Sequence, residues 1–204
     1  MIMGAEFKLK TAGGSADSPR EFRAETIKLV IGLGNPGAAY ARTYHNAGRL
    51  VARAFAGIPE SKFHARENFL SHRTPARTFV IPQTFMNESG RGAAAARRAF
   101  RAKPQACLVI HDDADLPLGA FRLQYGRGSA GHHGVESVIR AFGTKEFWRL
   151  RIGIRPPQME REKVDAPCLP AGRFVLRPMT RAAETAIRSA AEEFQQRYLN
   201  TSKN

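Results

Sequence analysis

Four polar side chains in this sequence have the residue types that a water-activating hydrolytic site needs. They are Asn35, His45, Asn87 and Asp112. A histidine, whose ordinary pKa is about 6.5, is the natural general base for activating water at neutral pH. A carboxylate bound to its other ring nitrogen fixes the tautomer and stabilises the imidazolium. Because asparagine amides can position a peptide-like substrate or donate to an oxyanion, the set predicts hydrolysis.

Other chemistry is open to the same residues. No serine or cysteine near them sits in a nucleophile-elbow pattern, which favours direct attack by water over a covalent route. Residues 111–115 read His-Asp-Asp-Ala-Asp, and closely spaced carboxylates are ligands for Mg²⁺. No second acidic cluster completes such a site, so we expect neither a metal nor a cofactor. In the plainest alternative His45 is an ordinary surface histidine, and Asp112 or Asp115 caps a turn or pairs with an arginine.

Short apolar runs predict the strands that must position these side chains. The predicted strands are residues 27–33, 78–81, 107–110, 120–124 and 147–154, and the predicted helices are residues 48–56, 91–101, 135–142 and 181–199. Because strands and helices alternate, we expect one α/β domain, a mixed and mostly parallel twisted sheet with helices on both faces. Residues 1–26 lack an apolar period and predict a flexible extension, so the domain is assigned to residues 27–204. Residues 61–72 are ambiguous.

The polar side chains directly follow the predicted strands. Asn35 and His45 come after the first strand, Asn87 comes after the second, and residues 111–115 form a polar loop after the third. Ligands of open α/β sheets bind at the carboxyl ends of the strands, so we expect these side chains to share one site. A glycine-rich loop at residues 126–134 precedes a predicted helix. Such a loop either presents free backbone N–H groups to an anion or serves merely as a turn.

Charge and composition narrow the choice of partner. The sequence has 32 Lys and Arg residues against 18 Asp and Glu residues, a net charge of +14. This excess favours a polyanionic partner such as nucleic acid over the alternative that the charge serves only solubility. Only Cys107 and Cys168 are present, and they form neither a disulfide framework nor a zinc pattern. No apolar stretch is long enough for a membrane span, and no signal peptide is visible. We expect a protein of the cytoplasm, or of an organelle such as the mitochondrion if the chain is eukaryotic, without a membrane partner.

Four motifs, in order and at compatible spacing, resemble the bacterial-type peptidyl-tRNA hydrolases, a family also found in eukaryotic organelles. They are GLGNPGAAYARTYHNAG at residues 32–48, PQTFMNESG at 82–90, HDDADLPLG at 111–119, and GHHG at 131–134 with residues 147–154 downstream. The resemblance covers residues 27 to about 199. It implies metal-independent hydrolysis of the ester that joins a peptide to the 3′-terminal ribose of tRNA. The implied partner is the acceptor stem and 3′ end of peptidyl-tRNA, bound by a monomer.

The resemblance also implies a role for each matched residue. His45 would be the general base and Asp112 its orienting partner. The residues implied to hold the peptide and the reacting carbonyl, or to shape the pocket, are Asn35, Asn87, Tyr40 and Met86. Those implied to grip the acceptor stem and its 5′-phosphate are Arg122 and Arg151, and a bidentate arginine suits a phosphate well.

This chain departs from the family pattern at two places near the implied site. The family usually has Gly-His-Asn-Gly where residues 131–134 read Gly-His-His-Gly, so His133 occupies a substrate-binding position normally held by asparagine. Gln124 stands where a phosphate-binding lysine is often found, and Arg127 is near enough in sequence to substitute for it. The alternative function is a non-catalytic RNA-binding relative that acts as a scaffold. Retention of the four polar residues favours the enzyme, whereas His133 leaves the scaffold open.

Overall fold

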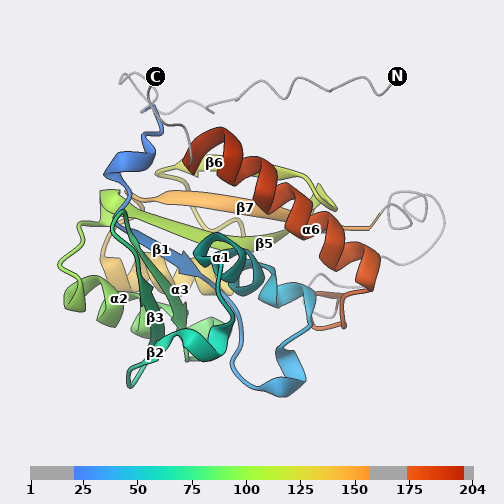
Figure 1. Ribbon diagram of the computed structural model, residues 1–204, viewed down its shortest axis with the longest axis horizontal. Coiled ribbons are helices and arrows are strands. Elements are labelled where there is room, and N and C mark those ends of the chain that lie inside the picture. Colours follow the sequence, from blue (N-terminus) through green and yellow to red (C-terminus); the bar gives the residue numbers. More distant parts are fainter. Residues whose placement is uncertain (1–20, 157–173, 200–204) are drawn as a thin grey trace.

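The computed structural model describes residues 21–156 and 174–199, which build one seven-stranded sheet with helices on both faces (Figure 1). The strand order is β2-β3-β4-β1-β5-β7-β6. The strands are β1 Leu29–Gly32, β2 His64–Ala65, β3 Phe69–Arg73, β4 Thr78–Pro82, β5 Cys107–Pro117, β6 Phe121–Tyr125 and β7 Trp148–Arg155. The four central strands β4, β1, β5 and β7 are parallel, and β2, β3 and β6 join by antiparallel pairing. The predicted mixed α/β sheet is confirmed, with its parallel pairing confined to the centre.

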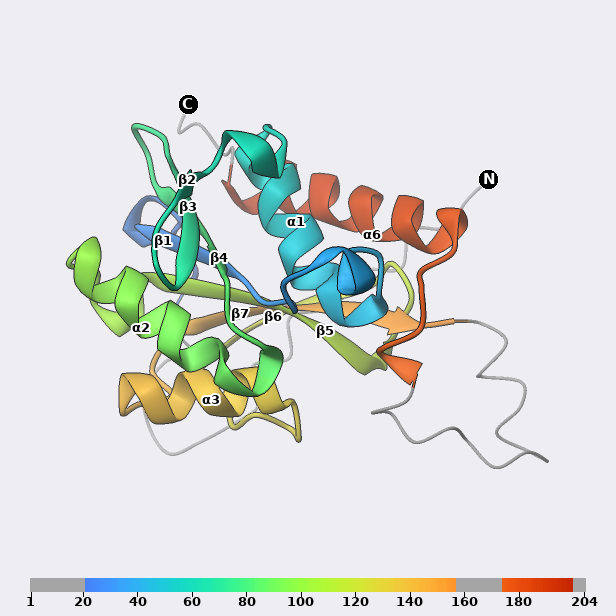
Figure 2. The same ribbon diagram turned by 90° about the horizontal axis from the view of Figure 1, so that it is seen from below.

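Helices cover the sheet in two pairs, one pair to each face (Figure 2). The helices are α1 Ala47–Ala56, α2 Ser89–Ala99, α3 His133–Phe142 and α6 Arg181–Phe194, the last continuing as a π-helical turn at Gln195–Leu199. Short 3-10 turns lie at η1 Ala24–Thr26, η2 Ala38–Tyr40, η3 Tyr44–Asn46, η4 Glu60–Lys62, η5 Met86–Glu88 and η6 Pro104–Ala106. Helices α1 and α6 pack on one face, and α2 and α3 on the other. Alternate residues of each strand therefore enter different cores, Leu108 and Ile110 facing α1, and Cys107 and Val109 facing α2 and α3.

Helix α1 approaches the sheet unusually closely. A Cβ atom added to Gly48 would lie 2.3 Å from the carbonyl oxygen of Ile110 and 2.8 Å from that of Leu33. Only glycine allows this approach, because any side chain at this position would overlap the backbone of β5. The close contact brings His45, three residues before Gly48, next to the part of β5 that follows Ile110.

The sequence prediction was wrong about the segment that follows Ile110. Residues 111–115 are not a loop, because β5 continues to Pro117. The register pairs His111 with Arg151 and Asp113 with Gly153 of β7, so the backbone groups are satisfied by a strand far away in sequence. Smaller differences occur at helix starts: α2 begins at Ser89 rather than Arg91, and α3 begins at His133 rather than Val135.

The packed structure begins before Ile27, the predicted start of the domain. The rings of Phe22 and Trp148 form a T-shaped pair with centroids 5.0 Å apart, and Phe22 also contacts Phe194 and Tyr198. Residues 1–20 of the predicted extension lie outside the described residues. The ambiguous residues 61–72 contain part of η4, all of β2 and most of β3. Within the described part of the chain, every helix is too short or too polar to cross a membrane.

Candidate active site

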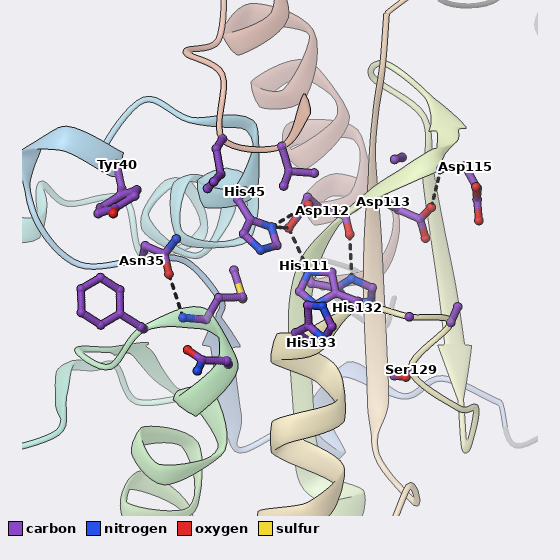
Figure 3. A pocket seen from close by; sticks show the side chains of 18 residues that line it. Asn35, Tyr40, His45, His111, Asp112, Asp113, Asp115, Ser129, His132 and His133 are labelled. Carbon is purple, nitrogen blue, oxygen red and sulfur yellow. Dashed lines mark hydrogen bonds and ion pairs between the residues drawn. The ribbon is translucent and has the colours of Figure 1, made fainter. Parts of the chain in front are cut away.

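A cavity of about 500 Å³ opens at the carboxyl ends of β1, β4 and β5 (Figure 3). All the residues predicted to be catalytic or to bind the peptide part of a substrate line it. They are Asn35, Tyr40, His45, Met86, Asn87, Asp112 and His133. The structure therefore brings the residues singled out in the sequence together at this edge of the sheet, although Asp112 reaches it from within a strand rather than from a loop.

His45 and Asp112 form a close pair in the wall of this cavity. Nδ1 of His45 lies 2.9 Å from Oδ1 and 3.0 Å from Oδ2 of Asp112. The side chain of Asp112 is 3% exposed and that of His45 is 14% exposed. The backbone N–H of His45 donates to the carbonyl of Val175 at 2.8 Å, which holds turn η3 against the segment before α6.

Asp112 is held as a carboxylate. Burial alone raises its pKa, but the neighbouring His132 and His45 rings, together with their hydrogen bonds, bring the pKa well below its usual range. An ionised carboxylate only accepts hydrogen bonds, so Nδ1 of His45 carries the proton and donates it. The lone pair of the neutral ring is then on Nε2, the nitrogen that Asp112 does not contact.

His132 is a third member of this group that the sequence prediction missed. Its Nε2 lies 3.0 Å from Oδ1 of Asp112, and its Nδ1 accepts from the backbone N–H groups of Gly134 and Val135 at the start of α3. The sequence signals were the pair of adjacent histidines and the match of His132 to the histidine of the family's Gly-His-Asn-Gly pattern, but the prediction chose His133. Two of the N–H groups at the start of α3 are thus occupied by a protein side chain rather than left free for an anion, one of the two alternatives that the sequence left open.

The adjacent His133 points outward from the first turn of α3. Its side chain is 79% exposed, and its Nδ1 lies 3.9 Å from the carboxylate of Glu136. The residue lines the mouth of the cavity, whereas His132 beside it is only 10% exposed and reaches Asp112. The two rings therefore have different surroundings although they are neighbours in sequence.

Ligand-type atoms of His45, Asp112 and His132 lie within 4.8 Å of one another, a composition that can bind a metal. The proton positions argue against it. Because Nδ1 of His132 accepts two N–H groups, the proton of its neutral ring must be on Nε2. Both ring nitrogens that face Asp112 are therefore donors, and neither offers a lone pair to a cation. The group is a hydrogen-bond network.

The other carboxylates of β5 do not join Asp112. Asp113 forms an ion pair with Nε of Arg151, and its Oδ1 accepts from the backbone N–H of Asp115 at 2.9 Å. Successive side chains of a strand point to opposite faces, which separates Asp112 from Asp113. A magnesium site would require the carboxylates of residues 111–115 to point toward one ion, and the separation of Asp112 from Asp113 does not provide this arrangement. An arginine pair is present in the segment, but it involves Asp113 rather than Asp112 or Asp115.

Asn35 lines the cavity beside β1, and the buried Asn46 fixes the loop that carries it. Oδ1 of Asn35 accepts from the backbone N–H of Met86 at 2.7 Å, which leaves the side-chain amide of Asn35 as a donor. Asn46, which the sequence prediction did not single out, fixes this loop by accepting from the backbone N–H of Asn35 at 2.7 Å and donating to its carbonyl at 3.0 Å. Asn87 is exposed on turn η5, and Tyr40 packs edge-on against the exposed ring of Phe85, 6.0 Å away.

The three predicted tRNA-binding residues lie beside the cavity rather than in it. Arg122 on β6 is the register partner of Arg151 on β7, so both project from the same face of the sheet. Arg149 lies two residues before Arg151 on this face and is 2% exposed. Burial, together with Arg151 and Arg127, lowers the pKa of Arg149 to about 10, which indicates that the cations are close together. We call Arg122, Arg127, Arg149 and Arg151 the arginine cluster.

His111 is a fully buried histidine beneath the active-site network. It is 2% exposed, its Nδ1 donates to the carbonyl of Asp112 at 2.8 Å, and its ring centroid lies 4.7 Å from that of His132. Burial lowers the pKa of His111 well below its ordinary value; His132 and Arg149 lower it further, and Asp112 offsets only part of this. His111 is therefore neutral in the folded protein.

A neutral buried histidine predicts acid sensitivity. The unfolded chain binds a proton at this residue below about pH 6.5 whereas the folded protein does not, so stability is present above that pH and is lost as the pH falls. We expect the free energy of unfolding to decrease by up to about 1.4 kcal/mol per pH unit below this value. Urea unfolding between about pH 7 and pH 5 measures the slope. His111→Asn should reduce it and exposed His64→Asn should not; an equal slope in all three proteins would contradict the assignment.

Comparisons with known proteins agree on one family. The family model described as peptidyl-tRNA hydrolase matches residues 29–203. The peptidyl-tRNA hydrolase of Thiobacillus denitrificans is 39% identical over 171 residues, covering 81% of this chain and 79% of the relative. That of Mycobacterium tuberculosis is 46% identical over 136 residues, covering 63% and 71%. A crystal structure of peptidyl-tRNA hydrolase from Acinetobacter baumannii, 27% identical, matches with a TM-score of 0.68 over 85% of this chain and 86% of that chain. This chain therefore belongs to the peptidyl-tRNA hydrolase family.

Proposed function

We propose that this protein hydrolyses the ester bond between the peptide and the 3′-terminal ribose of peptidyl-tRNA, with His45 as the general base. The observation that carries the proposal is the contact of Nδ1 of His45 with both carboxylate oxygens of Asp112, at 2.9 and 3.0 Å, in the wall of a cavity of about 500 Å³. This contact leaves Nε2 of His45 as a base for water. Membership of the family identifies the ester.

The reaction then proceeds in two proton transfers. Nε2 of His45 takes a proton from water as the oxygen attacks the ester carbonyl, and Asp112 stabilises the imidazolium. The carbonyl oxygen becomes an oxyanion, to which the amides of Asn35 and Asn87 donate. When the intermediate collapses, the imidazolium returns the proton to the departing 3′-oxygen of the ribose. The products are the free peptide and a tRNA with a 3′-hydroxyl group.

A covalent route through Cys107 finds no support. This thiol is buried, and burial raises its pKa to about 12 even though Arg97 acts in the opposite direction. Its side chain faces the core under α2 and α3 rather than the cavity. A protonated and inaccessible thiol is not a nucleophile, so water remains the attacking group.

The partly exposed members of the arginine cluster, Arg122, Arg127 and Arg151, would bind the acceptor stem. Guanidinium groups bind phosphates in a bidentate manner, and RNA helices are contacted mainly through their backbone and shape. Asp113 both lines the cavity and pairs with Arg151, so the cluster adjoins the place where the ester would lie. A single copy of the chain would then bind the stem with its arginines and place the 3′ end in the cavity. The setting would be the compartment of translation, the cytoplasm or an organelle.

Replacement of Arg151 by alanine should affect binding more than chemistry. We expect KM for peptidyl-tRNA to rise about tenfold with little change in kcat, because a charged contact to a phosphate is lost. The salt dependence of tRNA binding should also decrease by about one counterion. Steady-state kinetics and binding at several salt concentrations measure both effects. Arg73→Ala, an exposed arginine on β3 near the opposite edge of the sheet, is the control; equal losses in the two variants would argue against a specific site.

The direct test is release of an N-blocked aminoacyl group from tRNA at neutral pH. We expect the wild-type protein to produce deacylated tRNA at a rate that excess chelator does not change. Activity that chelator abolishes would instead support the metal-dependent alternative. Binding of tRNA without any release would support the non-catalytic scaffold. The assay thus separates the three functions that the sequence left open.

A further inference from the structure

We propose that His132 is a positioning residue of the catalytic site. It holds the carboxylate of Asp112 at the first turn of α3, and the carboxylate held in this way sets the tautomer of His45. The inference rests on the proposed role of His45 as the base. His132 was not among the catalytic or substrate-binding residues predicted from the sequence. Both of its ring nitrogens form hydrogen bonds with protein groups rather than facing the space that a substrate would fill.

The first step of the argument is the orientation of the His132 ring. Its Nδ1 accepts from the backbone N–H groups of Gly134 at 3.1 Å and Val135 at 3.2 Å, so the residue caps α3 with its own side chain. A capping acceptor satisfies N–H groups that have no partner inside the helix, which ties the ring to a rigid element. The proton of the ring is consequently on Nε2, and Nε2 points at Asp112 (Figure 3).

The second step concerns the carboxylate. Oδ1 of Asp112 accepts from His132 at 3.0 Å and from His45 at 2.9 Å, so two donors from different elements meet at one oxygen. A carboxylate bound to His45 alone would be free to rotate about its Cβ–Cγ bond together with the imidazole. The bond from His132 removes this freedom and leaves both oxygens within 3.0 Å of Nδ1 of His45. His45 is thereby held as a donor at Nδ1.

The third step shows why His132 acts only through Asp112. Its Nδ1 is occupied by α3 and its Nε2 by the carboxylate, so neither nitrogen can receive a proton from water. The ring lies between two others, with centroids 5.1 Å from that of His45 and 4.7 Å from that of His111. The side chain is 10% exposed, and its geometry is set by packing as well as by hydrogen bonds.

Two substitutions separate the two bonds that His132 makes. In His132→Asn, the side-chain oxygen stands near the position of Nδ1 and can cap α3, but the side chain is too short to reach Asp112. In His132→Gln, the amide group stands near the position of Nε2 and can donate to Asp112, while the cap is lost. Asparagine is among the best capping residues, so only the asparagine variant keeps the helix start intact.

The expected results are opposite for the two variants. In His132→Asn, kcat should fall roughly ten- to hundred-fold, the effect of losing a hydrogen bond to a charged group, while KM and Tm stay near the wild-type values. In His132→Gln, kcat should stay near the wild-type value while Tm falls by roughly 2–4 °C through loss of the cap. The substitution His64→Asn, at an exposed residue, should change kcat and KM by less than about twofold and leave Tm near the wild-type value.

Each outcome tests a different statement. Full kcat in His132→Asn, or equal loss of kcat in both variants, would overturn the positioning role, because a purely structural residue would lower Tm and kcat together. Wild-type protein without activity, or His45→Ala with wild-type turnover, would instead overturn the proposed function. The asparagine variant losing kcat while the glutamine variant retains it would support the inference.

Discussion

His45→Ala is expected to lower kcat for peptidyl-tRNA hydrolysis by about 10³-fold, the loss typical of removing a general base. The substitution deletes the imidazole that is bound to Asp112 through Nδ1 and keeps Nε2 available to water. It leaves the arginine cluster unchanged, so the affinity for tRNA should stay close to that of the wild-type protein. Asp112 keeps its hydrogen bond from His132, which limits the effect on folding. Single-turnover release and binding of deacylated tRNA measure the two quantities separately.

The control for this variant is His64→Ala, which removes an exposed imidazole from strand β2. It should leave both turnover and binding near the wild-type values. Turnover that is unchanged in His45→Ala would remove the assigned base. Joint loss of turnover and tRNA binding would mean that the substitution disturbs the fold rather than the chemistry.

Asp112→Asn is expected to be equally damaging or worse, with kcat reduced by about 10³- to 10⁴-fold. The network explains why. His132 cannot change tautomer, because its Nδ1 caps α3, so it continues to donate to the side-chain oxygen of the new asparagine. The asparagine NH₂ group then replaces Oδ2, which lies 3.0 Å from Nδ1 of His45, and this second donor favours an acceptor at Nδ1 over the N–H that the mechanism needs. The neutral amide also no longer stabilises the imidazolium, so the base at Nε2 is weakened in both respects.

The matched control for this substitution is Asp115→Asn, in the same strand. Asp115 is exposed, and its backbone N–H donates to Asp113 rather than to the His45–Asp112 network. We expect its kcat and its chelator response to match those of the wild-type protein. If the two carboxylates instead shared a bound cation, the two variants would lose activity together. Kinetics of both variants with and without chelator therefore distinguish the hydrogen-bond network from a metal site.

Much of this arrangement followed from local sequence. The apolar runs around Val30, Val80 and Leu108 predict strands because only burial in a sheet removes such side chains from water. Polar residues directly after parallel strands must meet at one edge, which is why Asn35, His45 and Asn87 share a cavity in the structure. The net positive charge of the chain and the arginines on β6 and β7 also indicated a nucleic-acid partner from the sequence alone.

The identity of the positioning histidine was decided only by tertiary structure. His132 and His133 are chemically identical neighbours, and local sequence does not say which one faces Asp112. The answer depends on where α3 begins, because the residue just before its first turn caps it and turns inward. The next residue then points outward, as the exposed ring of His133 does.

The sequence by itself determined the central strands and the main helices of this protein, the edge at which the polar residues gather, and the kind of chemistry they support. Tertiary structure alone decided that β5 runs on to Pro117, that Asp113 pairs with Arg151, and that Phe22 packs on Trp148. The physical reason is the range of the interactions. Apolar periodicity and turn chemistry act between neighbours in the chain, whereas strand register, ion pairs and ring contacts join residues that only the complete fold brings together.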